Sequence, residues 1–256
     1  MRITALLENT AKRCDLQAEH GLSLLIETEH HTVLFDMGQS DLFAKNAAVL
    51  GLDLAKVDLA VLSHGHYDHG GGLPAFLKIN SRARIYIHKD AFLPHYNGTE
   101  KYIGLDPALS GCGRITFTDG KRRIGNRLYV SPLPSFYEAS PASGLTELVE
   151  GRFIPDDFRH EQYLLIEEGG RRILFSGCSH RGVFPLLEVF RPDVLIGGLH
   201  LSKRPLDGEL AETADLLAAF PTEFYTCHCT GEAQLAFMKQ RMPKLHSLSC
   251  GESIEI

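Results

Sequence analysis

The sequence predicts an α/β protein in which two β-sheets pack face to face between outer layers of helices. Short β-rich runs followed by helical segments fill residues 2–88, and the same succession returns from residue 162 onward. The chain has 256 residues, which is enough to bury one sizeable core. We therefore expect a single domain over residues 1–256, with residues 89–158 as an insertion between its halves.

The first half is expected to open with strands. Apolar β-rich runs separated by polar turns predict strands at residues 2–8, 22–28, 32–36, 58–63 and 84–88. The segment SDLFAKNAAVLG (40–51) has apolar residues at helical spacing and ends in glycine, so it predicts an amphipathic helix. A second helix is expected over about 73–80.

The middle of the chain is less regular. Residues 89–158 contain many glycines, prolines and aromatic residues without a sustained period, apart from a hairpin predicted at Gly125 and Asn126. Loops on a rigid scaffold usually carry specificity, so we interpret this insertion as shaping a binding pocket. The alternative is a surface excursion without a functional role.

Regular patterning in the second half predicts a return to sheet and helix. YLLIEE, a turn at Gly169 and Gly170, and RRILFSG predict a hairpin. GVFPLLEVF, ELAETADLLAAF and QLAFMKQRM predict helices, whereas DVLIGG, EFYTCH and the region 246–256 predict strands. The chain has no internal repeat of fixed length.

The densest group of ionisable side chains is SHGHYDHGGG, at residues 63–72, directly after the fourth predicted strand. His64 and His66 are two positions apart and leave the strand end in the same direction, so they can bind one metal ion together. Asp68 and His69 are adjacent and point in different directions, so they can serve a second ion. Imidazole and carboxylate suit Zn²⁺, with Mn²⁺, Fe²⁺ or cobalt as alternatives. The competing interpretation is a glycine-rich loop with solvated histidines, but ligand-type residues fill four of six positions, which favours metal.

Composition limits the partners that we expect. The formal net charge is −6 and the longest basic run is KRR at 121–123, which argues against nucleic acid and favours a small-molecule substrate. No apolar run approaches the roughly 18 residues needed to cross a bilayer. The amino terminus lacks the pattern of a signal peptide, so we expect a soluble cytoplasmic protein that does not bind membranes.

The six cysteines are Cys14, Cys112, Cys178, Cys227, Cys229 and Cys250. They are few for this length and several lie beside histidines, which favours reduced thiols over a disulfide framework. Pairing or metal binding by Cys227 and Cys229 stays open at this point.

The HGHYDH motif after a buried strand, with further histidines at later strand ends, resembles the metallo-β-lactamase-fold superfamily. This resemblance implies an αββα sandwich with a one- or two-metal site at the edge between two mixed sheets. Finer matches are LLENTA, VLFDMGQS, VLSHGHYDHGGGL, HEQYLLI, FSGCSHRG, IGGLHL and YTCHCTGE. They are similar to the branch labelled 7,8-dihydropterin-6-methyl-4-(β-D-ribofuranosyl)aminobenzene-5′-phosphate synthase.

The resemblance extends the ligand set. It implies that His160, in HEQ, is the third histidine of the first ion and that His228 completes the second. Asp36, in FDMG, matches the family's early Asp-x-Gly turn; it would orient a ligating imidazole without touching metal. The remaining histidines (20, 30, 31, 88, 95 and 246) lack partners at ligand spacing, so we expect them to be solvated or in the core.

The sequence departs from the family at Cys178, which occupies the position of the bridging aspartate. A thiolate there is softer but carries the same single charge. Cys178 is alternatively a small buried core thiol, and His180 is alternatively the ligand in its place or a residue that orients the site. His200 is expected near the substrate, with a role at the strand end as the alternative.

The resemblance implies an enzyme with two divalent ions, expected to be Zn²⁺. Asp68, His180 and His200 are the expected catalytic residues, and Arg181 is expected to help grip the substrate. The expected activity is that of a hydrolase or transferase acting on a small anionic metabolite that is phosphorylated, an ester or cyclic. The branch itself implies condensation of a pterin with an aminobenzene ribosyl phosphate. Two rivals are a non-catalytic or redox metal-binding protein and a metal-dependent nuclease.

Overall fold

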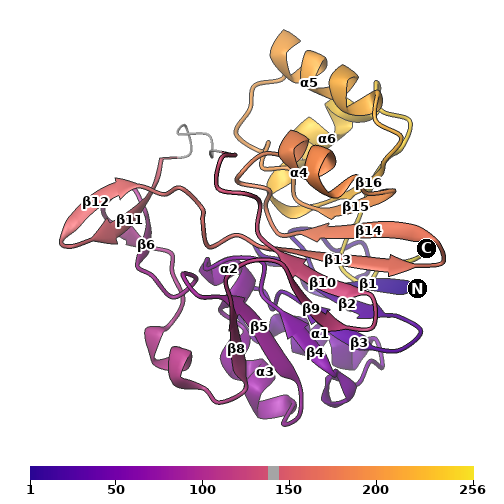
Figure 1. Cartoon of the computed structure of the whole chain (residues 1–256). Helices are drawn as coiled ribbons and strands as arrows, with labels where there is room; N and C mark the ends of the chain where they lie inside the picture. The colour runs from indigo at the N-terminus through magenta and orange to yellow at the C-terminus, as the bar shows by residue number, and fades with distance from the viewer. Residues whose placement is uncertain (138–143) are drawn as a thin grey trace.

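Two seven-stranded β-sheets lie face to face between two layers of helices in the computed structural model, which describes residues 1–137 and 144–256 (Figure 1). The first sheet has the order β18-β1-β2-β3-β4-β5-β8, and the second has the order β17-β16-β15-β14-β13-β10-β9. Helices α1 and α3 lie on the outer side of the first sheet, and α4, α5 and α6 on that of the second (Figure 1). The predicted α/β fold with two sheets between helical layers is confirmed.

The strands are β1 (Arg2–Leu7), β2 (Ser23–Glu27), β3 (Thr32–Phe35), β4 (Leu59–Val61), β5 (Arg84–His88), β6 (His95–Asn97), β7 (Lys101–Tyr102), β8 (Ile115–Thr118), β9 (Arg122–Gly125), β10 (Leu128–Ser131), β11 (Leu145–Val149), β12 (Arg152–Pro155), β13 (Tyr163–Glu168), β14 (Arg171–Ser176), β15 (Val194–Gly197), β16 (Glu223–Thr226), β17 (Leu245–Ser247) and β18 (Ser253–Glu255). The α-helices are α1 (Leu42–Val49), α2 (Tyr67–Gly70), α3 (Leu73–Ile79), α4 (Val183–Phe190), α5 (Gly208–Ala218) and α6 (Glu232–Lys239). Short 3₁₀ helices are η1 (Leu54–Lys56), η2 (Pro107–Gly111) and η4 (His228–Thr230).

Both sheets combine an antiparallel part with a parallel part. In the first sheet, β1, β2 and β3 pair antiparallel, and β3, β4, β5 and β8 pair parallel. In the second sheet, β9, β10, β13 and β14 pair antiparallel, and β14, β15, β16 and β17 pair parallel. Because these strands pair parallel, their carboxyl ends lie at one edge of each sheet.

Three groups of buried apolar side chains explain the layers. One group lies between the sheets and includes Phe35 of β3 and Phe175 of β14, whose ring centroids are 5.9 Å apart. A second joins the first sheet to α1 and α3, and a third joins the second sheet to α4, α5 and α6. The burial of both sheet faces accounts for the nearly continuous apolar runs in β4 and β15.

The segment 89–158 is divided between three sheets. Strand β8 extends the first sheet, and the β9–β10 hairpin, predicted at Gly125 and Asn126, extends the second. Only β6, β7, β11 and β12 form a separate four-stranded sheet, which projects from the sandwich at the left of Figure 1. Residues 138–143 of the expected insertion lie outside the described residues.

Most predicted elements match the structure to within two or three residues at each end. An unexpected element is α2, a single helical turn that contains Asp68 and His69. The side chains of Asp68 and His69 therefore project from a helical turn and not from an irregular glycine loop. The sequence pattern did not predict this helical turn. Within residues 1–137 and 144–256, no helix is both long and apolar enough to span a membrane.

Candidate metal centre

The ligand-type side chains gather where parallel strands of both sheets end. His64 and His66 follow β4, and Cys178 and His180 follow β14, while His200 and His228 follow β15 and β16. All of them except His200 are at most 8 % exposed. The centre therefore forms at the junction of the two sheets, as expected for α/β folds, whose ligands bind at strand carboxyl ends.

Asp36 and Ser63 fix the orientation of His64. The Ser63 amide donates to Asp36 Oδ1 and the Ser63 hydroxyl donates to Asp36 Oδ2, both at 2.7 Å. Because this hydroxyl hydrogen is already used, His64 Nδ1–H donates to Ser63 Oγ, 2.8 Å away. The lone pair of His64 then lies on Nε2, which is buried without a hydrogen-bond partner.

Two further imidazoles present lone pairs to each other. His69 Nδ1 donates to Asp36 Oδ2 at 2.7 Å, and His228 Nδ1 donates to Asn9 Oδ1 at 2.9 Å. The remaining Nε2 atoms of His69 and His228 are 3.1 Å apart. Two facing lone pairs at this distance require a shared cation, either a proton or a metal ion. Burial lowers the pKa of His69, but Asp36 and Asp68 outweigh it and raise the pKa to about 9.

Asp68 and Cys178 complete a four-membered group around these two nitrogens. His69 Nε2 lies 3.7 Å from Asp68 Oδ2 and 3.3 Å from Cys178 Sγ, and His228 Nε2 lies 3.4 Å from Asp68 Oδ2. Zinc bonds of about 2.0–2.3 Å give ligand separations of roughly 3.2–3.8 Å around a tetrahedron. Burial alone would raise the pKa of Asp68, but the neighbouring histidines hold it well below its usual value.

A second group consists of His64, His66 and His180, whose ligating atoms lie within 4.8 Å of one another. His66 Nε2 and both ring nitrogens of His180 are buried without hydrogen-bond partners. Burial and the neighbouring imidazoles lower the pKa of all three histidines well below the usual value. Neutral imidazoles with free lone pairs are what a divalent cation requires.

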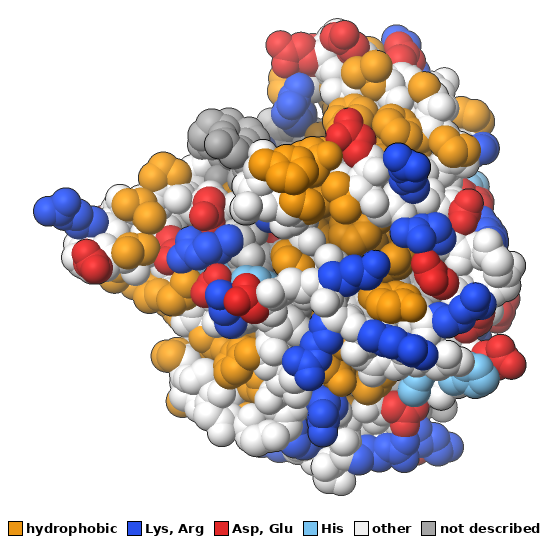
Figure 2. Space-filling model, in the orientation of Figure 1, with side chains coloured by type: hydrophobic (Ala, Val, Ile, Leu, Met, Phe, Trp, Pro, Cys, Tyr) orange, Lys and Arg blue, Asp and Glu red, His pale blue; other side chains and the backbone are white. Residues whose placement is uncertain are grey.

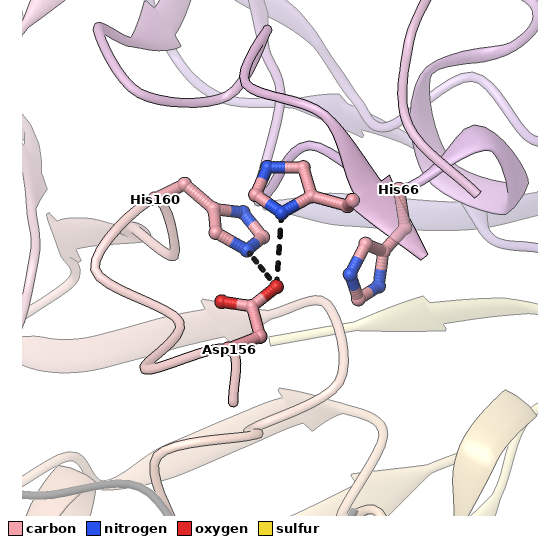
Figure 3. A group of neighbouring side chains, drawn as sticks. His66, Asp156 and His160 are labelled. Carbon is pink, nitrogen blue, oxygen red and sulfur yellow. Dashed lines mark hydrogen bonds and ion pairs between the residues drawn. The ribbon is translucent and has the colours of Figure 1, made fainter. Parts of the chain in front are cut away.

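His160 lies beside this group but faces away from it. Its Nδ1 accepts from the Gly65 amide at 2.9 Å, so the hydrogen of the neutral ring lies on Nε2. That Nε2 is 3.3 Å from Asp156 Oδ2, and Figure 3 shows Asp156 between His160 and His66. Sequence reasoning assigned His160 to the ion of His64 and His66; the structure places His160 in a group with His66, and His180 in a group with both His64 and His66.

His95, which was expected to be solvated or in the core, lies beside other ligand-type side chains. It is fully buried, its Nδ1 lies 2.9 Å from Asp156 Oδ2, and it joins His66, Asp156 and His160 in one group. The four-residue spacing of Asp156 and His160 is a local signal that could have identified Asp156. No comparable signal connects His95, because it comes from β6, about 60 residues earlier.

Cys178 is common to three groups of candidate ligands: one with His64 and His69, one with His180 and His200, and one with His228 and Cys229. Burial raises the pKa of the Cys178 thiol well above its usual value. Both Cys227 and Cys229 are free thiols, so they do not pair. The bridging role that the resemblance implies for Cys178 stays a prediction.

His20, His200 and Arg181 occupy the periphery of the centre. The half-exposed His20 contacts Asp68 through Nε2 at 3.1 Å, which sequence reasoning did not predict. The His200 ring lies 4.3 Å from that of His180. Arg181 was expected to grip substrate, but its guanidinium donates to the backbone carbonyls of Leu133, Pro134 and Tyr137 and so holds that loop.

Two cavities border the centre from different sides. One has a volume of about 630 Å³ and is lined by His20, His228 and Cys229 together with Lys12 and Lys239. The other has a volume of about 700 Å³, and Asp156 is part of its wall. Charged side chains of both signs line the rest of this wall: the cations Lys89, Arg159 and Arg181 and the carboxylates Asp90, Asp119 and Asp157. Both volumes suit small-molecule ligands.

Basic side chains occupy part of the outer surface. Figure 2 shows Lys and Arg side chains across the middle of one face, where β9, β10 and β14 lie in Figure 1. Arg171 and Arg172 of β14 pair with Glu223 and Glu167, at 3.3 and 2.8 Å. Part of this positive charge is therefore neutralised.

Buried, unpartnered imidazole nitrogens next to a carboxylate and a thiol fit a divalent metal ion, so fold and site together define an αββα protein with a candidate metal site. The model of the metallo-beta-lactamase superfamily matches residues 16–227. The chain belongs to this superfamily, whose members are mostly metal-dependent hydrolases.

Individual relatives agree with this assignment. The crystal structure of Tm1679, described as a metal-dependent hydrolase of the beta-lactamase superfamily, is 31 % identical with a TM-score of 0.85, covering 100 % of this chain and 99 % of that one. The uncharacterised protein MJ0448 of Methanocaldococcus jannaschii is 29 % identical, over 93 % of this chain and 94 % of its own length. The 7,8-dihydropterin-6-methyl-4-(beta-D-ribofuranosyl)-aminobenzene-5'-phosphate synthase of the same organism is 26 % identical, over 93 % and 90 %.

Proposed function

We propose that the protein is a dinuclear, zinc-class metalloenzyme that hydrolyses or transfers a group on a small phosphorylated, ester or cyclic metabolite. The observation that carries the proposal is the pair of facing Nε2 atoms of His69 and His228, whose Nδ1–H groups are already donated elsewhere. One ion would bind Asp68, His69, His228 and Cys178. The other would bind His64, His66 and His180, with Cys178 between them.

Bound divalent ions would supply Lewis acidity, which polarises a phosphoryl or carbonyl oxygen and lowers the pKa of water. The chain's own residues supply position and shielding. Asp36 and Ser63 orient His64 and His69, Asn9 orients His228, and the buried surroundings exclude bulk water. His20 and His200, at the more exposed edge, are suitably placed to contact a substrate.

The cavity lined by His228 and Cys229 is the proposed substrate site, since it borders the candidate ligands directly. Lys12 and Lys239 in its wall suit an anionic group on the substrate. The similar synthase of M. jannaschii is named for a phosphorylated aminobenzene product, which supports a phosphorylated substrate. The pterin condensation is the specific form of the proposal.

Metal content and turnover test the proposal together. Asp68→Ala should lose about one zinc per chain, measured by inductively coupled plasma mass spectrometry, and should abolish turnover of phosphodiester, ester and lactone substrates. Asp15→Ala, at an exposed ion pair with Arg13, is the control and should change neither value. Full zinc and full rate in Asp68→Ala would contradict the ligand assignment.

A non-catalytic metal-binding protein is the second candidate, because Cys229 lies with Cys178 and His228. Two thiolates can saturate an ion and leave no open coordination position. The visible spectrum of the Co²⁺-substituted protein separates the two candidates. A spectrum that added substrate analogues or inorganic phosphate leave unchanged, together with no turnover, would favour the non-catalytic protein.

A further inference from the structure

The motif HEQ, at residues 160–162 just before β13, hydrogen-bonds to the strand ends of both sheets. Its three side chains are fully buried, with exposed fractions of 0 %. One set of bonds goes to the segment after β4, which carries His64 and His66, and another goes to the segment after β14, which carries His180. Because these three histidines come from different sheets, their separation depends on how the two segments are joined.

His160 and Gln162 hold the segment of the first sheet. The Gln162 amide donates to the Ser63 carbonyl at 2.7 Å. The Gly65 amide donates to His160 Nδ1 at 2.9 Å. Since Ser63 and Gly65 flank His64, these bonds fix the backbone on both sides of that histidine.

Glu161 holds the segment of the second sheet. Its Oε1 accepts from the His180 amide at 2.9 Å, and its Oε2 accepts from the Arg181 amide at 3.1 Å. The Tyr163 hydroxyl donates to the same carboxylate. Without Glu161, two buried amides would lose their acceptor, which costs free energy. This carboxylate therefore fixes the backbone from which the His180 ring projects.

The ring of His180 is held by the same turn of the chain. Phe158 stacks on it with a centroid distance of 4.2 Å and an interplanar angle of 3°. The Glu161 amide donates to the Phe158 carbonyl at 2.9 Å, so one turn contacts both the ring and the backbone of His180. Within residues 1–137 and 144–256, the ring nitrogens of His180 have no hydrogen-bond partner. The orientation of the ring therefore depends on packing and on its backbone.

We propose that residues 160–162 are positioning residues: they set the separation of the segments that carry His64, His66 and His180, and they do not bind the ion themselves. A metal ion requires its ligands at fixed separations. Residues that orient ligands typically change metal affinity by about 10- to 100-fold. The inference rests on the proposed function, because it assumes one ion bound by these three histidines.

His160 thus holds a ligand segment, although the family resemblance implied that it binds metal. Its Nδ1 lone pair accepts from the Gly65 amide, so the hydrogen of the neutral ring lies on Nε2. That Nε2 faces Asp156 Oδ2 at 3.3 Å. Neither nitrogen of this ring then offers a lone pair to a cation.

Glu161→Gln is the main test. It keeps the side-chain volume but leaves one acceptor oxygen in place of two, so the amide of His180 or of Arg181 loses its acceptor. The variant should bind Zn²⁺ about tenfold or more weakly in a chelator competition titration. The visible spectrum of its Co²⁺-loaded form should differ from that of the wild type. Glu147→Gln, at a buried glutamate that pairs with Arg159 at 2.6 Å, is the matched control and should change neither value.

Two substitutions of His160 separate positioning from ligation. His160→Asn places an amide oxygen near the position of Nδ1, so it can still accept from the Gly65 amide. It should keep the zinc content and the zinc affinity of the wild type. His160→Ala cannot accept and should weaken the affinity. Loss of one ion per chain in His160→Asn would show that His160 is a ligand and would overturn the proposal.

Further measurements keep the test decisive should Glu161→Gln fail to fold. Glu161→Asp keeps the charge but is one methylene shorter, so it cannot reach both amides and should also weaken zinc binding. In crystals of the zinc-loaded wild type, anomalous scattering at the zinc edge should give a peak bonded to His180 and none bonded to His160. Wild-type zinc affinity in a folded Glu161 variant, or a peak bonded to His160, would overturn the proposal.

The outcomes also separate this inference from the proposed function. If Asp68→Ala loses zinc while the Glu161 variants bind it as the wild type does, only the positioning role is refuted. If the wild type binds no divalent ion at all, both proposals fail. If the Glu161 variants bind zinc more weakly while Asp68→Ala keeps its zinc, the positioning role holds and the assignment of Asp68 fails.

Discussion

Replacing Asn9 tests whether the residues behind the ligands position the metal. Asn9 Oδ1 accepts from His228 Nδ1 at 2.9 Å and from the Gly21 amide at 3.2 Å, and Asn9 Nδ2 donates to the His228 carbonyl at 3.3 Å. Asn9→Ala removes all three hydrogen bonds. The His228 ring would then be free to rotate, or to adopt the tautomer with hydrogen on Nε2, which cannot bind metal.

The magnitude follows from the two hydrogen bonds that hold His228. At about 0.5–1.5 kcal/mol each, they contribute about 1–3 kcal/mol, which corresponds to roughly 5- to 150-fold in affinity. Residues that orient metal ligands typically change metal affinity by about 10- to 100-fold. We therefore expect Asn9→Ala to weaken binding of the ion near His228 by about tenfold or more.

A chelator competition titration with Zn²⁺ measures this change. Asn9→Asp is the informative comparison, because a carboxylate still accepts from His228 Nδ1 and should keep the affinity near that of the wild type. Asn97→Ala, at an exposed position on β6, controls for loss of an asparagine away from the centre. If Asn9→Ala binds Zn²⁺ within twofold of the wild type, His228 is not a ligand positioned in this way.

Two more substitutions test the packing and the metal preference of the centre. Cys178→Asp keeps one negative charge but exchanges a soft for a hard ligand, so folded protein should retain its metal content and take up more Mn²⁺ in competition with Zn²⁺. A variant that fails to fold would instead support a core role for the thiol. Gly177→Ala would place a Cβ 2.2 Å from Ser63 Oγ and 3.0 Å from His64 Nδ1, so it should cost about 1–3 kcal/mol and lower the Tm by several degrees in differential scanning calorimetry. Gly113→Ala, where a Cβ meets nothing within 4 Å, is its control, and equal Tm values would refute the close packing.

The sequence by itself determined the sandwich and the position of the centre. Strands and helices have local periodicities, and the motif at residues 63–72 directly follows a recognisable strand, so His64 and His66 could be placed at a sheet edge. The histidines and cysteine after later strands could be assigned to the same edge, since parallel strands end together.

Only the tertiary structure decided which side chains share a neighbour. Ser179, His200 and His228 have φ angles of 56°, 51° and 52°, so the backbone turns out of its ordinary conformation just beyond three strands. Such turns depend on contacts with distant segments, such as the bond from the His228 amide to Glu8. The grouping of His180 with His64, and of His95 with the neighbouring pair Asp156 and His160, follows from long-range contacts and could not be obtained from local pattern.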